Sequence, residues 1–149
     1  MSQSSNKGKR GERELCRELR QYGFGAIRSA QVAGVKGCDD SADIITSIDP
    51  VRFEVKRGYE GVGITSQKFD GWRRKLISET VKGEVPALAW RKNRQPWMFF
   101  LFGRGEFRRA ELMIGLGAFI EGLASFFGGD ISEYKVDDPQ SWRTTGTFT

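Results

Sequence analysis

The chain contains no histidine and only two cysteines among its 149 residues. Without imidazole, a metal site must use oxygen ligands, which suit hard cations such as magnesium or manganese. Cys16 and Cys38 lack the spacing of a zinc or redox motif, so we expect a reducing intracellular compartment and a core position for Cys16. No apolar run reaches membrane-spanning length, and the polar start is unlike a signal peptide. We therefore expect a cytoplasmic protein, cellular or viral.

The chain also has fewer acidic than basic residues. The chain has 24 Lys and Arg residues against 19 Asp and Glu, which gives a net charge of +5. The excess lies mainly in residues 1–36. Such a balance favours a polyanionic partner, nucleic acid first and an anionic membrane surface second. At this length we expect one domain with a single core.

Residues 42–45 and 51–56 predict two short strands joined by a turn. In the second strand apolar and charged residues alternate, so Glu54 and Lys56 share one face. Asp43, in the first strand, can join them if the hairpin closes. Two converging carboxylates repel each other unless a cation lies between them, which predicts a metal site. The alternative is an ordinary ion pair on a solvent-exposed strand face.

A helix is predicted from Lys9 to Tyr22. Glu12 lies on the apolar face of this helix, whereas Glu14 and Glu18 fit that face less well. Burying an unpaired carboxylate is costly, so Glu12 is a candidate site residue. The equally weighted alternative is an acid placed in the first turn to interact with the helix dipole.

The rest of the pattern predicts a mixed β-sheet flanked by helices, an α/β fold. The expected elements are strands at 26–30, 86–90 and 97–102, a basic loop at 32–40, a helix capped by Thr65 or Ser66 and ending near Thr80, and an apolar helix at 111–127. The strands at 86–90 and 97–102 are too apolar for an exposed edge. We expect them in a sheet covered on both faces, or at an interface.

Five short motifs follow one another along residues 7–56. Together they closely resemble the archaeal-type Holliday junction resolvases, part of the wider PD-(D/E)xK, restriction-endonuclease-like fold. The motifs are Lys7-Gly8-x-x-Gly11-Glu12-Arg13-Glu14-Leu15, Gly23-Phe24, Ile27-Arg28-Ser29-Ala30, Asp43-Ile44-Ile45 and Phe53-Glu54-Val55-Lys56. On this basis we divide the single domain, 1–149, into flexible residues 1–7, a nuclease core at 8–102, and a C-terminal helix and tail at 103–149 without a family counterpart. That last segment is a candidate dimer element.

The resemblance implies a metal-dependent endonuclease that resolves four-way DNA junctions by paired, symmetric cuts, acting as a homodimer. It implies that Glu12, Asp43 and Glu54, with the Val55 carbonyl, hold Mg2+, for which Mn2+ can substitute. Lys56 completes the catalytic set by orienting water or stabilising the developing charge. Arg13 and Arg28 match residues that contact the DNA backbone. Because they are positively charged, we also predict phosphate contacts for Lys7, Arg10, Lys36 and Arg57.

Two departures from the family pattern bear on function. Ala42 replaces the Pro of the PD motif, which carries no chemistry. The serine that often helps place the scissile phosphate is missing, so its role is vacant or moved to Gln31 or Ser41. A nuclease of the same fold that cuts forks, flaps or duplex DNA therefore remains open. The further alternative is a basic nucleic-acid-binding module without catalysis, in which the four site residues are incidental.

Overall fold

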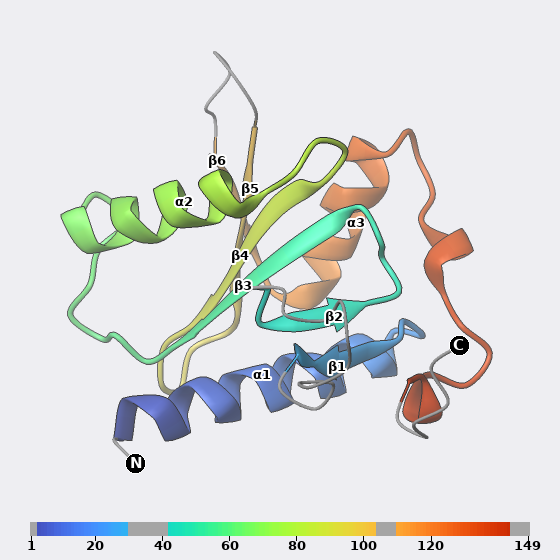
Figure 1. Ribbon diagram of the computed structural model, residues 1–149, viewed down its shortest axis with the longest axis horizontal. Coiled ribbons are helices and arrows are strands. Elements are labelled where there is room, and N and C mark those ends of the chain that lie inside the picture. Colours follow the sequence, from blue (N-terminus) through green and yellow to red (C-terminus); the bar gives the residue numbers. More distant parts are fainter. Residues whose placement is uncertain (1–2, 30–41, 104–109, 144–149) are drawn as a thin grey trace.

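The fold is a single layer of β-strands with helices on both sides (Figure 1). The computed structural model describes residues 3–29, 42–103 and 110–143. In chain order the main elements are α1 (Gln3–Gln21), β1 (Ala26–Arg28), β2 (Ile44–Thr46), β3 (Val51–Arg57), α2 (Gln67–Glu79), β4 (Val85–Arg91), β5 (Met98–Phe102), β6 (Ala110–Ile114) and α3 (Leu116–Phe126).

The six strands lie in the sheet in chain order, β1-β2-β3-β4-β5-β6. β3 and β4 are parallel, with Glu54 opposite Leu88, and every other neighbouring pair is antiparallel. The parallel pair requires a crossover, which α2 provides. A mixed sheet flanked by helices is therefore confirmed, as are the hairpin at β2 and β3 and the helix capped by Ser66, whose hydroxyl accepts from the Phe69 amide at 3.1 Å.

Both faces of the central strands are buried, because side chains alternate between two apolar clusters. One cluster packs α1 and α3 against the sheet. It includes Leu15, Leu19, Phe53, Ala87, Phe99 and Phe119. The other packs α2 against the opposite face and includes Trp72, Leu76, Leu88, Trp90 and Phe100. The prediction that the strands at 86–90 and 97–102 are covered on both faces is confirmed.

The C-terminal segment returns to the start of the sheet, at the lower right in Figure 1. Phe24 forms a β-bridge with Lys135, and the Val136 amide donates to the Gly23 carbonyl at 3.0 Å. A Cβ on Gly25 would lie 2.2 Å from the Trp142 ring, so glycine is needed for this contact. The described part of the tail therefore packs against residues 23–25, at the start of the sheet.

Two element predictions are wrong in their boundaries. The apolar helix predicted from residue 111 begins only at Leu116, because residues 110–114 form β6 and pair with β5. Gly115, with φ +88°, separates the two elements. The first helix starts at Gln3 rather than Lys9, so residues 3–7, predicted to be flexible, are helical.

Most of the large apolar side chains of this C-terminal helix are internal. Leu116, Phe119 and Leu123 belong to the core, whereas Phe126 is exposed. The loop predicted at residues 32–40, which includes Lys36 and Cys38, lies outside the described residues. Gln31 and Ser41 lie outside them as well. In the part of the chain that is described, no helix has the length and apolar character needed to cross a membrane.

Candidate active site

The acidic residues predicted to bind metal come together from three elements. Glu12 lies on α1, Asp43 directly precedes β2, and Glu54 lies in β3. They line one hollow of about 250 Å3 whose full lining is Gly8, Glu12, Asp43, Glu54, Val55, Lys56, Arg57, Tyr59 and Lys75. The structure thus places all five residues predicted for catalysis and metal binding at one site.

Asp43 is held by the backbone where β2 separates from β3. Its Oδ2 accepts a hydrogen bond from the Val55 amide at 2.8 Å. Its own carbonyl accepts from the Ser29 amide at 3.0 Å, and the Ser29 hydroxyl donates to the Ala42 carbonyl. These bonds fix Asp43 beside Val55 without a proline at position 42.

Glu54 and Lys56 share the α2-facing side of β3 and are largely screened from water. The Glu54 side chain is only 6% exposed, so the alternative of an ion pair on a solvent-exposed face is wrong. The Lys56 Nζ lies 3.4 Å from Glu54 Oε1 and 5.3 Å from the centroid of the Trp72 ring. The buried indole confines the ammonium to the side of the carboxylate.

Glu12 reaches the hollow because α1 packs very close to β3. A Cβ on Gly11 would lie 2.8 Å from Arg57 Cβ and 3.5 Å from Val55 Cγ1, a separation that only glycine permits. The Arg28 Nε donates to Glu12 Oε1 at 3.1 Å, which ties the helix to β1. Arg28, predicted to contact DNA, thus pairs with a site carboxylate in this structure.

The electrostatics of the hollow favour a bound cation. Burial raises the pKa of Asp43, and the charge of Glu12 adds to this, although the Val55 amide and two lysines act against it. Burial and the charge of Asp43 likewise raise the pKa of Glu54. Two desolvated carboxylates that resist ionisation gain most from a divalent ion between them.

The chemistry of the donor set suits such an ion. Among the described residues, no three acidic or thiol side chains stand together as a complete metal-ligand group. Asp43, Glu54 and Val55, which all line the hollow, carry hard oxygen donors, whereas Glu12 is engaged by Arg28.

We expect ionisation of Asp43 and Glu54 to lower the stability of the metal-free protein at neutral pH relative to mild acid. The pKa values of Asp43 and Glu54 are higher in the folded state than their usual 3.8 and 4.5. Folding then favours the protonated forms, so this contribution is complete below the unfolded pKa values and is lost as pH rises through the folded ones.

Thermal denaturation in EDTA across pH checks this expectation. Asp43→Asn should raise the melting temperature above wild type at neutral pH, and the difference should shrink in acid, where wild-type Asp43 is protonated. Each kcal/mol corresponds to about 2–4 °C for a chain of this size. An Asp43→Asn protein that melts lower than wild type at every pH would contradict the electrostatic account.

Lys75 lines the same hollow, although it was not among the site residues predicted from the sequence. Its Nζ lies 3.9 Å from Glu79 Oε1, and its charge lowers the pKa of both Asp43 and Glu54. It follows the buried Trp72 by three residues on α2, a spacing that puts both on one side of the helix. This spacing from Trp72 was the feature of the sequence that could have indicated that Lys75 lies at the site.

Lys75→Met should slow metal-dependent cleavage by roughly fivefold, since a partly exposed charge is worth about 1 kcal/mol. The acid limb of the pH–rate profile should move to higher pH, because the site carboxylates lose a neighbouring cation. Lys82→Met removes an exposed lysine that lines no described hollow and serves as the control. Equal profiles for the two variants would exclude Lys75 from the site.

The predicted DNA contacts occupy different environments. Lys7, Arg10 and Arg13 are exposed along α1, and the Lys7 side chain passes over Gly58, next to the hollow. Arg57, by contrast, is buried, with its Nε 3.2 Å from Glu14 Oε2. Its position favours a structural role over a free phosphate contact. Lys36 lies outside the described residues.

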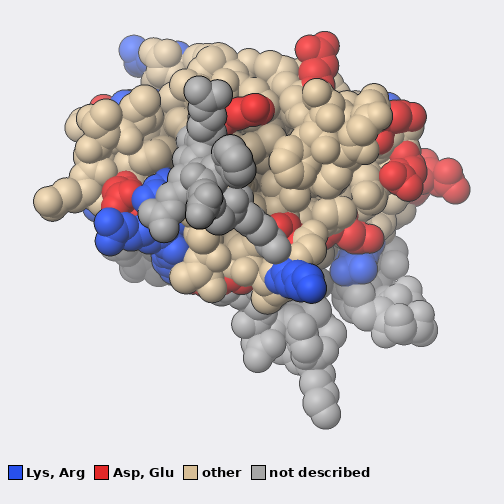
Figure 2. Space-filling view, turned by 90° about the horizontal axis from the view of Figure 1, so that it is seen from above, with Lys and Arg blue, Asp and Glu red and all other residues tan. Residues whose placement is uncertain are grey.

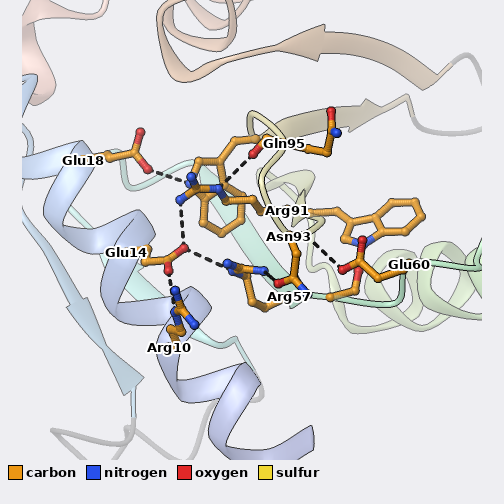
Figure 3. A network of polar contacts seen from close by, with 11 residues as sticks. Arg10, Glu14, Glu18, Arg57, Glu60, Arg91, Asn93 and Gln95 are labelled. Atoms are coloured by element: carbon orange, nitrogen blue, oxygen red, sulfur yellow. Dashed lines mark hydrogen bonds and ion pairs between the residues drawn. The ribbon is translucent and has the colours of Figure 1, made fainter.

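The faces of α1 were judged incorrectly for two acids. Glu14 contacts Arg57 and Arg91 on the sheet, and Glu18 accepts a hydrogen bond from the Trp97 indole at 2.6 Å (Figure 3). Both carboxylates therefore point toward the sheet, as Glu12 does. Cys16 is buried as expected, and burial raises the pKa of its thiol to about 12, so it is unreactive.

Charge is unevenly spread over the surface. In Figure 2, acidic side chains gather at the right, over α3 and the segment after it, and the largest basic cluster lies at the left, toward α2. The acidic side includes Glu121, Asp130 and Glu133, all exposed. None of the residues that line the hollow comes from this acidic segment; they lie on or next to α1, β2, β3 and α2.

Comparison with known proteins decides the family. The model of the archaeal Holliday junction resolvase family (Hjc) matches residues 3–114. The chain belongs to this family. A search of curated proteins gave no match.

Among solved structures, Hjc of Archaeoglobus fulgidus, a Holliday junction resolvase from an archaeal hyperthermophile, is 25% identical in sequence. The alignment covers 71% of this chain and 87% of that chain, with a TM-score of 0.41.

Membership of the resolvase family makes the chain a metal-dependent endonuclease that acts on Holliday junctions. The matched range contains every residue that lines the hollow, from Gly8 to Lys75. It also extends through β6, whereas the resemblance seen in the sequence stopped near residue 102. α3 and the C-terminal segment lie beyond the match to the resolvase family.

Proposed function

We propose that this chain resolves four-way DNA junctions by paired, symmetric phosphodiester hydrolysis at the hollow between α1, β3 and α2. The observation that carries the proposal is the pair of desolvated carboxylates, Asp43 and Glu54, facing Lys56 in a member of the resolvase family. Asp43, Glu54 and the Val55 carbonyl would hold Mg2+, with Mn2+ able to substitute, and Glu12 would complete the set.

Hydrolysis adds the oxygen of water to phosphorus while a P–O bond to the leaving oxygen breaks, and charge builds on the non-bridging oxygens. When bound, the metal supplies Lewis-acid stabilisation of that charge and lowers the pKa of water. Lys56 would donate a hydrogen bond to the attacking water or to a phosphate oxygen, since Trp72 limits where its ammonium can move. Arg28 would hold Glu12 in place beside them.

Paired cuts require two such centres, and a two-fold symmetric dimer provides them on a junction that has the same symmetry. The strands β4 and β5, which the sequence offered as a possible interface, are internal, and this leaves β6 at the sheet edge. Leu112 and Ile114 on this strand are 47% and 51% exposed. We propose that β6 contributes to contact with the second copy, since no strand among the described residues pairs with its outer side and its apolar residues are exposed.

A substrate panel tests the proposal. Labelled four-way junction, fork, flap, duplex and single-stranded DNA are incubated with the protein and Mg2+, and nicks are mapped on all strands. We expect two symmetric nicks on the junction and little cutting of the other substrates. Equal cutting of flaps or duplex would identify a less selective nuclease, and binding without cutting of any substrate would overturn the catalytic assignment.

A further inference from the structure

A second hollow, of about 530 Å3, lies beside the catalytic one and has no role in the mechanism above. It is lined by Arg10, Arg57, Glu60, Asn93 and Arg94. Arg57 lines both hollows, so the two adjoin each other. Its walls come from α1, the end of β3 and the turn after β4.

Positive charge exceeds negative charge around this hollow. The Glu14 carboxylate forms ion pairs with three guanidinium groups. The nitrogen-to-oxygen distances are 3.0 Å for Arg10, 3.2 Å for Arg57 and 3.0 Å for Arg91 (Figure 3). Burial alone would raise the pKa of Glu14, but these arginines together lower it, so the carboxylate stays ionised. One carboxylate cannot neutralise three guanidiniums, and Arg94 and Glu60 add one charge of each sign.

Hydrogen bonds hold part of the lining in place, whereas two of its arginines are exposed. Arg57 donates to the Asn93 side-chain oxygen at 2.6 Å, and the Asn93 amide donates to Glu60 Oε1 at 2.9 Å. Arg10 is 68% exposed, and Arg94 is exposed and makes no ion pair within the described residues. These two guanidiniums retain N–H groups that can face a ligand.

We infer that this hollow binds a backbone phosphodiester of the DNA, flanking the phosphate that occupies the catalytic hollow. Arg10 and Arg94 contact its oxygens, and Arg57, fixed by Glu14 and Asn93, supplies positive charge from below. Guanidinium groups suit this ligand because their paired N–H groups match two phosphate oxygens. The inference rests on the proposed function, since it assumes that a DNA strand enters the neighbouring hollow.

The salt dependence of junction binding tests the inference. Wild type, Arg10→Gln, Arg94→Gln and the double variant are titrated with four-way junction in EDTA over a range of KCl concentrations. Removing one phosphate contact should reduce the slope of log K against log salt by about one. We therefore expect the double variant to lose about one to two units of slope and roughly tenfold in affinity at moderate salt.

Lys82→Gln is the matched control, because it removes one exposed positive charge in the turn before β4, whereas the hollow lies after the end of β4. Circular dichroism and melting temperature verify that each variant is folded. A double variant with the same slope as Lys82→Gln would overturn the inference. Because these titrations contain no metal, they are read independently of cleavage: failure of wild type to cut a junction in Mg2+ would instead refute the proposed function.

Discussion

Asp43→Asn should abolish metal-dependent cleavage of a four-way junction while leaving junction binding in EDTA within a few-fold of wild type. The substitution removes the charge of the carboxylate but keeps a side-chain oxygen. That oxygen can still accept the hydrogen bond from the Val55 amide, which lies 2.8 Å from Oδ2 in the wild-type protein. Since a bound metal contributes several kcal/mol of charge stabilisation, we expect a loss of roughly 10^3-fold in single-turnover rate.

Glu121→Gln is a suitable control, because it removes an exposed carboxylate from α3, outside the hollow. It should cut at the wild-type rate. The Asp43→Asn substitution also separates catalysis from folding: we expect the metal-free variant to be at least as stable as wild type at neutral pH. Cleavage by Asp43→Asn at the wild-type rate would show that the metal site is assigned incorrectly.

Gly11→Val should damage both folding and catalysis, although residue 11 carries no chemistry. Its Cβ would lie 2.8 Å from Arg57 Cβ, so α1 must move away from β3 or Arg57 must leave its ion pairs. Overpacking of this kind typically costs about 1–3 kcal/mol of unfolding free energy. Movement of α1 also shifts Glu12 and Glu14, so we expect cleavage to fall by about 10²-fold, the cost of a small misplacement.

The comparison is with Gly71→Ala on α2, where an added Cβ meets nothing within 4 Å. That variant should keep its activity and gain slightly in stability, because alanine is the better helix former. Chemical denaturation and single-turnover cleavage of both variants check the prediction. A Gly11→Val protein with wild-type stability and rate would mean that close packing of α1 does not position the site.

The catalytic hairpin could be predicted because its signals are local. Alternation along β3 places Glu54 and Lys56 on one face, and the turn before Val51 closes the hairpin against Asp43. The same alternation puts Arg57 on the face of Phe53 and Val55, toward α1. It therefore contained the evidence that Arg57 is buried, although its charge suggested a DNA contact.

Glu14 could not be placed in the same way, because its partners are distant in sequence. Arg57 and Arg91 reach it from two neighbouring parallel strands, and the helix pattern alone gives no information about them. β6 was missed for a different reason. Residues 110–127 are rich in apolar side chains on both sides of Gly115, so the sequence shows no change of pattern there, yet residues 110–114 pair with β5 as a strand.

The central claim is that the hollow containing Asp43 and Glu54 hydrolyses junction DNA with the help of a divalent metal. The most direct test is single-turnover cleavage of an end-labelled, immobile four-way junction in Mg2+ and in EDTA. The structure predicts paired symmetric nicks that appear with Mg2+ and are absent in EDTA. Cleavage of equal rate and position in EDTA would contradict the account, because the two carboxylates would then act without the cation that their environment requires.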